Sequence, residues 1–76
     1  MKKSEWAINL LRDDYFIEMM EELRGVELAK FLNSDYGDVE VREQSYLRLR
    51  VLESIDNYIQ GLADQKIIDE KKLKIL

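Results

Sequence analysis

The stretch of sequence that decides the fold runs from Leu52 to Leu62 and reads LESIDNYIQGL. Its aliphatic residues recur at spacings of 3, 4 and 3, which places them along one side of an α-helix. A stripe of this kind must be buried against another helix of the same chain or against a second copy. The predicted interface stripe consists of Leu52, Ile55, Ile59 and Leu62.

The residues around this stripe predict a broad interface. Arg48 occupies the same helical register, one turn before Leu52. A charged side chain at that position must either extend out to solvent or meet an acid of a neighbouring chain, as polar residues in helical interfaces do. Leu47, Val51 and Tyr58 lie beside the stripe and widen it, which is typical of a helix that packs on more than one neighbour.

Turn-forming residues gather in one place, residues 33–38, which read NSDYGD and divide the chain into two nearly equal halves. We expect a loop there, with Gly37 supplying a positive φ and Asp38 capping a helix over about residues 39–65. The loop has oxygen-bearing side chains on alternate residues, as a calcium loop has. Gln44 stands where such a loop needs its glutamate, so the pattern does not predict calcium binding.

The remaining segments complete an all-α prediction. Ser4 can cap a short N-terminal helix, and Asp13 or Asp14 can cap a longer one before the loop. Residues 67–76 can form a short C-terminal helix, with Asp64 or Asp69 as its candidate cap. The predicted fold is an antiparallel helical hairpin with short flanking N- and C-terminal helices, in one domain covering residues 1–76. The apolar residues expected on one side of the first long helix are Phe16, Met19, Met20, Leu23 and Val26.

The length and composition of the chain predict that it associates with itself. A chain of 76 residues buries only about 60% of the surface that its unfolded form exposes. It has no cysteine, so disulfides and thiolate metal sites cannot reinforce it. Good helix packing or oligomerisation remains, and we expect a homo-oligomer. No apolar run is long enough to cross a membrane, so no membrane association is expected.

The residue types present argue against catalysis. Without histidine or cysteine, nucleophile–base pairs of the Ser-His or Cys-His kind cannot be built. Four carboxylates of the first long helix could in principle share a proton or hold a cation. Their spacing places them on the side of the helix opposite its apolar residues, where water solvates them. We therefore expect no enzyme activity, no catalytic residues, no cofactor and no metal site. This acidic face consists of Asp14, Glu18, Glu21 and Glu22.

The charge distribution disfavours nucleic acid as a partner. The net charge is −4, with five basic and nine acidic groups in residues 1–38 and seven of each in residues 39–76. Binding to phosphates needs Lys and Arg clustered on one face. The only local cluster of lysines is near the C-terminus, where three acids dilute it. It consists of Lys66, Lys71, Lys72 and Lys74 among Asp64, Asp69 and Glu70.

Two further features are candidate contact residues. Tyr36 lies in the loop, and exposed aromatic residues in loops are typical interface anchors. The chain also ends in apolar residues, Leu73, Ile75 and Leu76. These three either fold back onto the domain or insert into a partner.

Parts of the sequence resemble small helical proteins encoded among the head and packaging genes of tailed bacteriophages. The resemblance covers about the last two thirds of the chain and implies virion assembly, packaging or an accessory contact with the head. It implies no role for any single residue. The residues that show it are Asn33-Ser34-Asp35, Arg42-Glu43, Tyr46, Arg50, Leu52-Glu53, Ile55 and Lys72-Leu73-Lys74-Ile75-Leu76.

These observations lead to one main hypothesis and two alternatives. The main hypothesis is a non-enzymatic interaction protein in phage virion assembly or packaging, self-associating through the predicted stripe. Alternatively, the chain is a small acidic phage inhibitor or adaptor that captures a host protein through the acidic face or the apolar terminus. A nucleic-acid accessory factor using the C-terminal lysines is the second alternative. The expected location is the cytoplasm of the bacterial host or the virion, because no signal segment follows Lys2 and Lys3 and cysteine is absent.

Overall fold

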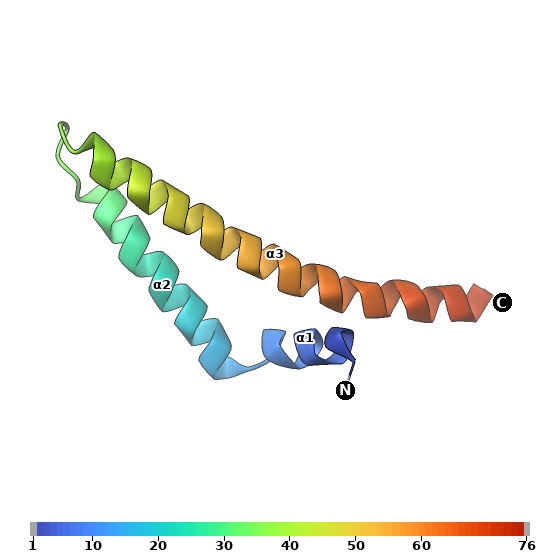
Figure 1. The fold of residues 1–76 in the computed structure, drawn as a ribbon. Helices are drawn as coiled ribbons and strands as arrows, with labels where there is room; N and C mark the ends of the chain where they lie inside the picture. The colour runs from blue at the N-terminus through green and yellow to red at the C-terminus, as the bar shows by residue number, and fades with distance from the viewer. Residues whose placement is uncertain (1, 76) are drawn as a thin grey trace.

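The protein is all-α. A computed structural model describes the backbone of residues 2–75 and the side chains of residues 2–65. The described backbone forms three α-helices, α1 (Lys3–Leu11), α2 (Asp14–Leu32) and α3 (Val39–Ile75), and contains no strand (Figure 1). The long helices are joined by residues 33–38, as the turn-forming residues predicted.

The start of α2 confirms one predicted cap, whereas the start of α1 does not. Asp13 is the N-cap of α2, and its carboxylate accepts a hydrogen bond of 2.9 Å from the backbone N–H of Phe16. Helix α1 begins at Lys3 with Lys2 at the N-cap, and no side chain caps it. Ser4 is therefore inside the helix, and the prediction that it caps α1 is wrong.

The loop before α3 differs from the expected turn. Gly37 does not have a positive φ, so residues other than glycine could adopt its backbone conformation. Asp38 directly precedes α3, and its carbonyl accepts from Arg42 N–H at 3.2 Å. The carboxylate of Asp38 accepts instead from the backbone N–H of Asp35 at 3.0 Å. It thus stabilises the loop rather than the first turn of the helix.

Helix α3 is longer than predicted, and the expected break before a separate C-terminal helix is wrong. The helix continues through Gly61 and Asp64 to Ile75. Asp64 was a candidate cap, but its carboxylate accepts a 3.0 Å hydrogen bond from Nε2 of Gln60, one turn earlier. A carboxylate bonded along the helix surface does not compete for backbone N–H groups. The sequence also has no proline that would force the helix to end.

Helices α1 and α2 both lie on one side of α3 (Figure 1). Helix α2 runs beside the first part of α3, and α1 lies beside a later part. Between α1 and α3, the residues Ala7, Ile59 and Ala63 form a buried cluster. Small side chains at two of these positions let the helix backbones approach closely. The half-buried residues packed against the cluster are Ile8, Leu10, Leu11, Phe16 and Leu62.

The buried side of α3 is rotated from the predicted stripe. Leu52 and Ile59 lie on it, but Ile55 is 42% exposed. Two polar positions explain the rotation, because Ser45 is buried and Asp56 forms an ion pair with Arg24 of α2. An apolar pattern alone cannot detect them. The buried or half-buried residues at spacings of 4, 3, 4, 3 and 4, which we call the inner seam, are Ser45, Leu49, Leu52, Asp56, Ile59 and Ala63.

The face expected on α2 is likewise only partly buried. Phe16 is half-buried and Met20 is buried, as predicted. Met19, Leu23 and Val26 are exposed, so this part of the expected apolar face lies on the surface and not in the core. Arg24 and Glu27 take their place toward α3. Two charged residues thus lie where the interface between two helices usually has apolar ones.

The molecule is elongated, with extents of 60 × 23 × 15 Å. Its radius of gyration is 17.1 Å, against about 11 Å for a compact chain of this length. In residues 2–65, four apolar residues are buried. Only two of these are large, so this part of the chain buries little apolar surface by itself. The four are Ala7, Met20, Ile59 and Ala63.

Candidate interaction surface

A second row of apolar residues on α3 faces outward. These side chains follow one another at spacings of 4, 4, 3 and 4, so they share one side of the helix. At about 100° per residue, this row lies about a third of a turn away from the inner seam. Leu62, at its edge, is half-buried and the others are exposed. We call this row the outer stripe; it consists of Leu47, Val51, Ile55, Tyr58 and Leu62.

Helix α2 extends this apolar surface on one side of the outer stripe. Leu23 and Val26 are exposed and line a groove of about 310 Å³ together with Val51 and Leu52. Glu27 and Arg48 complete its lining. The groove is therefore apolar along its length, with one ion-pairing position between the two helices.

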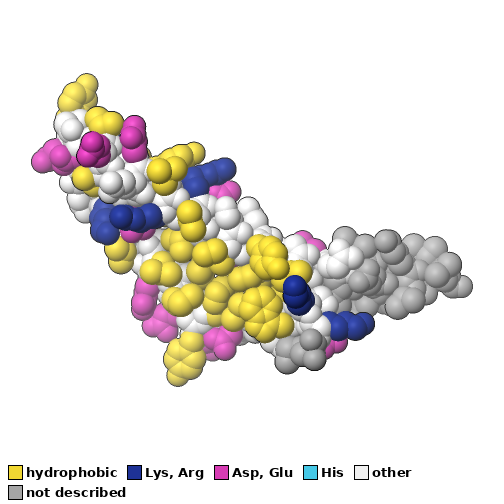
Figure 2. Space-filling model, in the orientation of Figure 1, with side chains coloured by type: hydrophobic (Ala, Val, Ile, Leu, Met, Phe, Trp, Pro, Cys, Tyr) yellow, Lys and Arg dark blue, Asp and Glu magenta, His cyan; other side chains and the backbone are white. Residues whose placement is uncertain are grey.

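Helix α1 extends the surface on the other side. Trp6 is 45% exposed and lines a hollow of about 460 Å³ with Lys3, Tyr58 and Leu62. Figure 2 shows the hydrophobic side chains gathered over the middle of the molecule, where the three helices meet. We call the whole surface the apolar face; it consists of the outer stripe, Leu23, Val26 and Trp6.

Charged residues cross between α2 and α3 beside the apolar face. Arg24 pairs with Asp56, and both side chains are more than one third exposed. Oε2 of Glu27 lies 3.5 Å from Nη1 of Arg48 and accepts no hydrogen bond from the described part of the chain. Oε1 of Glu27 lies 3.5 Å from Nζ of Lys30. The acid beside Arg48 therefore belongs to the same chain. The sequence analysis expected solvent or an acid of a neighbouring chain there.

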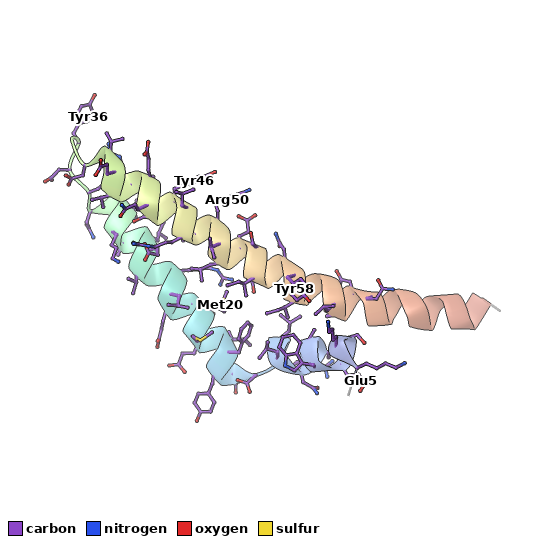
Figure 3. The ribbon with its side chains drawn as sticks, viewed as in Figure 1. Glu5, Met20, Tyr36, Tyr46, Arg50 and Tyr58 are labelled. Atoms are coloured by element: carbon purple, nitrogen blue, oxygen red, sulfur yellow. The ribbon has the colours of Figure 1, made fainter. Side chains whose placement is uncertain are left out.

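Hydrogen bonds from Arg42 hold the backbone of the loop tip around Tyr36. Tyr36 is 99% exposed and projects away from both helices (Figure 3). Its backbone carbonyl accepts from Nη2 of Arg42 at 3.0 Å, and the carbonyl of Asp35 accepts from Nη1 at 2.5 Å. Nη1 also lies 3.4 Å from the hydroxyl of Ser34. Arg42 thus fixes the loop backbone while the tyrosine side chain remains open to solvent.

The carboxylates of the acidic face are exposed to solvent, and among residues 2–65 no ion pair joins them to a basic side chain. The described residues contain no group of three or more acidic, histidine or cysteine side chains that could hold a metal ion. Within residues 2–65, the acidic face is therefore an exposed surface of negative charge on α2. It consists of Asp14, Glu18, Glu21 and Glu22.

Several predicted contact residues lie outside the described side chains. The backbone of Leu73 and Ile75 belongs to α3, but their side chains, and all of Leu76, are outside the described residues. The same holds for the side chains of the C-terminal lysines. None of the described helices is long and apolar enough to span a bilayer.

Sequence reasoning missed three parts of this surface. The spacing of apolar residues placed Leu23 and Val26 on one face of the helix but did not show that this part of the face is exposed, and it did not assign Trp6 to a surface. Leu23 and Val26 are exposed while Arg24 and Glu27 face α3, an arrangement that apolar spacing does not show. Arg42 offered a weak signal, because an arginine one turn into a helix can reach back to the loop before it.

No protein-family model, no curated protein and no solved structure matches this chain. Its function is therefore inferred from its own surface.

Proposed function

We propose that this chain is a non-enzymatic assembly protein, an accessory factor of phage virion assembly or packaging. In this proposal the helical hairpin self-associates through its apolar face. The observation that supports the proposal best is the continuity of that face over three helices, with Val51 and Tyr58 about 60% exposed at its centre. Large contiguous apolar patches on soluble proteins usually mark interaction sites.

The small core gives a second reason for association. Only Met20 and Ile59 are large buried apolar residues within residues 2–65. A chain with so few buried side chains gains stability from any contact that the folded form alone can make. Covering the apolar face would give the elongated molecule the buried surface that one copy lacks.

The magnitudes favour a reversible association. Fully burying a large apolar side chain contributes about 1.5–3 kcal/mol, so a half-exposed one contributes about 1 kcal/mol on further burial. Five residues of the outer stripe from each of two copies therefore contribute about 10 kcal/mol. Association costs about 4–15 kcal/mol in lost freedom of motion. The balance of these two free energies predicts an oligomer that forms at high protein concentration and dissociates on dilution.

The experiment that tests self-association compares two substitutions on α3. Ile55→Asp places a charge in the middle of the outer stripe. Tyr46→Asp is the matched control, because Tyr46 is exposed on a different side of the helix (Figure 3). Light scattering should show an oligomer for the unmodified chain and the control, and a monomer for Ile55→Asp. If Ile55→Asp and the unmodified chain have the same oligomeric mass, the apolar face is not the interface.

The role in virion assembly needs its own test. An epitope-tagged chain is produced during phage infection, and assembled heads are purified away from free protein. We expect the tagged chain to accompany heads or head precursors, and Ile55→Asp to reduce its amount severalfold. An equal amount of the two proteins on heads would contradict a role for the apolar face. Absence of the tagged chain from every head intermediate would contradict the assembly role.

The acidic face favours a second candidate, an inhibitor or adaptor that binds a basic surface of a host protein. Its exposed carboxylates have no basic partner among residues 2–65. The double substitution Glu18→Lys and Glu21→Lys should then abolish a stoichiometric host complex, while Ile55→Asp leaves it intact. The assembly role predicts the opposite result for binding to heads. Ile55→Asp should reduce that binding, and the double substitution should leave it intact.

A further inference from the structure

We propose that the apolar face is covered by a second copy of this chain in antiparallel orientation, with the two α3 helices crossing near Ile55. This inference rests on the proposed self-association and adds the orientation and register of the two copies. The three observations behind it are the position of Ile55 within the outer stripe, the opposite charges at the two ends of α3 and the length of α3.

Ile55 lies at the centre of the outer stripe. Leu47 is eight residues before it and Leu62 is seven residues after it. In a two-fold antiparallel pair centred there, Ile55 meets its own copy, and Val51 lies beside Tyr58 of the other copy. Both ends of the stripe are then covered. A parallel pair would cover the same residues, so the apolar residues alone do not decide the orientation.

The charges on either side of the outer stripe decide the orientation. The loop and first turn of α3, residues 33–43, contain four acids and only Arg42 as a base, a net charge of −3. Residues 66–76 contain four lysines and two acids, a net charge of +2. A parallel pair places like charges together at both ends, which opposes association. An antiparallel pair places opposite charges together at both ends.

The distances along α3 agree with this arrangement. Asp38 and Lys72 are each seventeen residues from Ile55, or about 25 Å along a helix. Helix α3 continues beyond the end of α1 to Ile75 (Figure 1). In the antiparallel pair, this extension lies beside residues 33–43 of the second copy. The acidic loop tip, including Tyr36, and the lysine-containing end of α3 are then neighbours.

Disulfide cross-linking tests the orientation, because the chain has no cysteine of its own. Ile55→Cys should cross-link two copies under mild oxidation, since it lies on the axis. Val51→Cys alone should not, because residue 51 of one copy then lies opposite residue 59 of the other, eight residues or about 12 Å along the helix from residue 51 of that copy. A disulfide cannot bridge Cα atoms more than about 7 Å apart. A mixture of Val51→Cys and Tyr58→Cys chains should form a mixed cross-linked dimer.

The control and the contrary outcomes are distinct. Tyr46→Cys, exposed on a different side of α3, should cross-link at least tenfold less than Ile55→Cys. If Val51→Cys cross-links with itself as fully as Ile55→Cys does, the antiparallel orientation is wrong although self-association stands. If Ile55→Cys stays monomeric by light scattering and does not cross-link, the orientation and the proposed self-association both fail.

Charge reversal gives a second measurement that needs no cysteine. The pair Lys71→Glu and Lys72→Glu should weaken association at least tenfold at low salt, and so should Glu40→Lys with Glu43→Lys. Mixing the two variant chains should restore association, because each then meets opposite charge at both ends. Unchanged association of either variant alone would contradict the antiparallel pair.

Discussion

Arg24 of α2 and Asp56 of α3 form an ion pair across the helix interface, where the inner seam would otherwise continue with an apolar residue. The pair shows that Asp56 lies on the side of α3 that faces α2. With Asp56 turned inward, Ile55 is turned outward and 42% exposed. The rotation of α3 that brings Asp56 to Arg24 therefore also leaves Ile55 exposed on the apolar face.

The first prediction concerns the strength of this ion pair. Because both side chains are more than one third exposed, solvent screens them, and a double-mutant cycle with Arg24→Ala and Asp56→Ala should give a coupling of about 0.5–1 kcal/mol. The exposed pair Arg50–Glu53, at 3.0 Å within α3, is the control and should give about 0.3 kcal/mol. Urea unfolding followed by circular dichroism measures both. A zero coupling for Arg24 and Asp56 would show that the pair does not stabilise the helix packing.

The second prediction concerns the start of α2. Asp13→Ala removes the acceptor of the Phe16 N–H hydrogen bond and should lower the free energy of unfolding by about 1 kcal/mol. Asp14→Ala lies one residue later, inside the helix, and should cost less than half as much. Equal losses in urea unfolding would contradict the assignment of Asp13 as the cap.

The third prediction concerns a buried hydroxyl. Ser45 is buried, and its Oγ has no hydrogen-bond partner among the described residues. Ser45→Ala should therefore be neutral or raise the free energy of unfolding by up to about 1 kcal/mol. Ser54 is the control, since its exposed hydroxyl donates to the carbonyl of Arg50 at 3.0 Å. Ser54→Ala should change stability by less than about 0.5 kcal/mol. A clear loss of stability in Ser45→Ala would show that the hydroxyl has a partner.

The fourth prediction concerns the close contact between α1 and α3. Ala63→Leu inserts three carbon atoms beside the buried Ala7 and should cost about 1–3 kcal/mol. Asn57→Leu, an exposed position on the same helix, should cost less than about 0.5 kcal/mol. Thermal unfolding distinguishes the two. If Ala63→Leu unfolds at the same temperature as the unmodified chain, α1 does not pack closely there.

The fifth prediction concerns the loop tip. Arg42→Ala removes the donors to the carbonyls of Asp35 and Tyr36, so the loop should become more mobile. Amide hydrogen exchange in residues 34–38 should accelerate severalfold, while exchange in the middle of α2 stays unchanged. Arg50→Ala, about two turns further along α3 than Arg42, is the control. Unchanged exchange in Arg42→Ala would show that the guanidinium does not hold the loop.

Local sequence signals predicted the elements of this fold well. The NSDYGD run has the turn-forming residues that end and begin helices, and the long helices end and begin at its borders. Asp13 and Asp14 were the two candidate caps, because a carboxylate before a helix can accept a free backbone N–H, and Asp13 is the one that does so. The continuation of α3 past Asp64 was missed, because the Gln60 side chain engages that carboxylate.

The candidate interaction surface could be predicted only in part. Spacing identified Ile55, and it also placed Leu52 and Ile59 on the same helix side. It could not separate the inner seam from the outer stripe, because both contain aliphatic residues and lie about a third of a turn apart. Trp6 could not be assigned to the surface without knowing where α1 packs.

The amino-acid sequence by itself determined the helical class, the position of the loop and the presence of more apolar surface than one short chain can bury. These depend on backbone preferences and local spacing, which act within a few residues. Only the tertiary structure decided which apolar residues face inward. That choice depends on contacts between distant residues, such as Arg24 with Asp56 and Ala7 with Ala63, and no local pattern contains them.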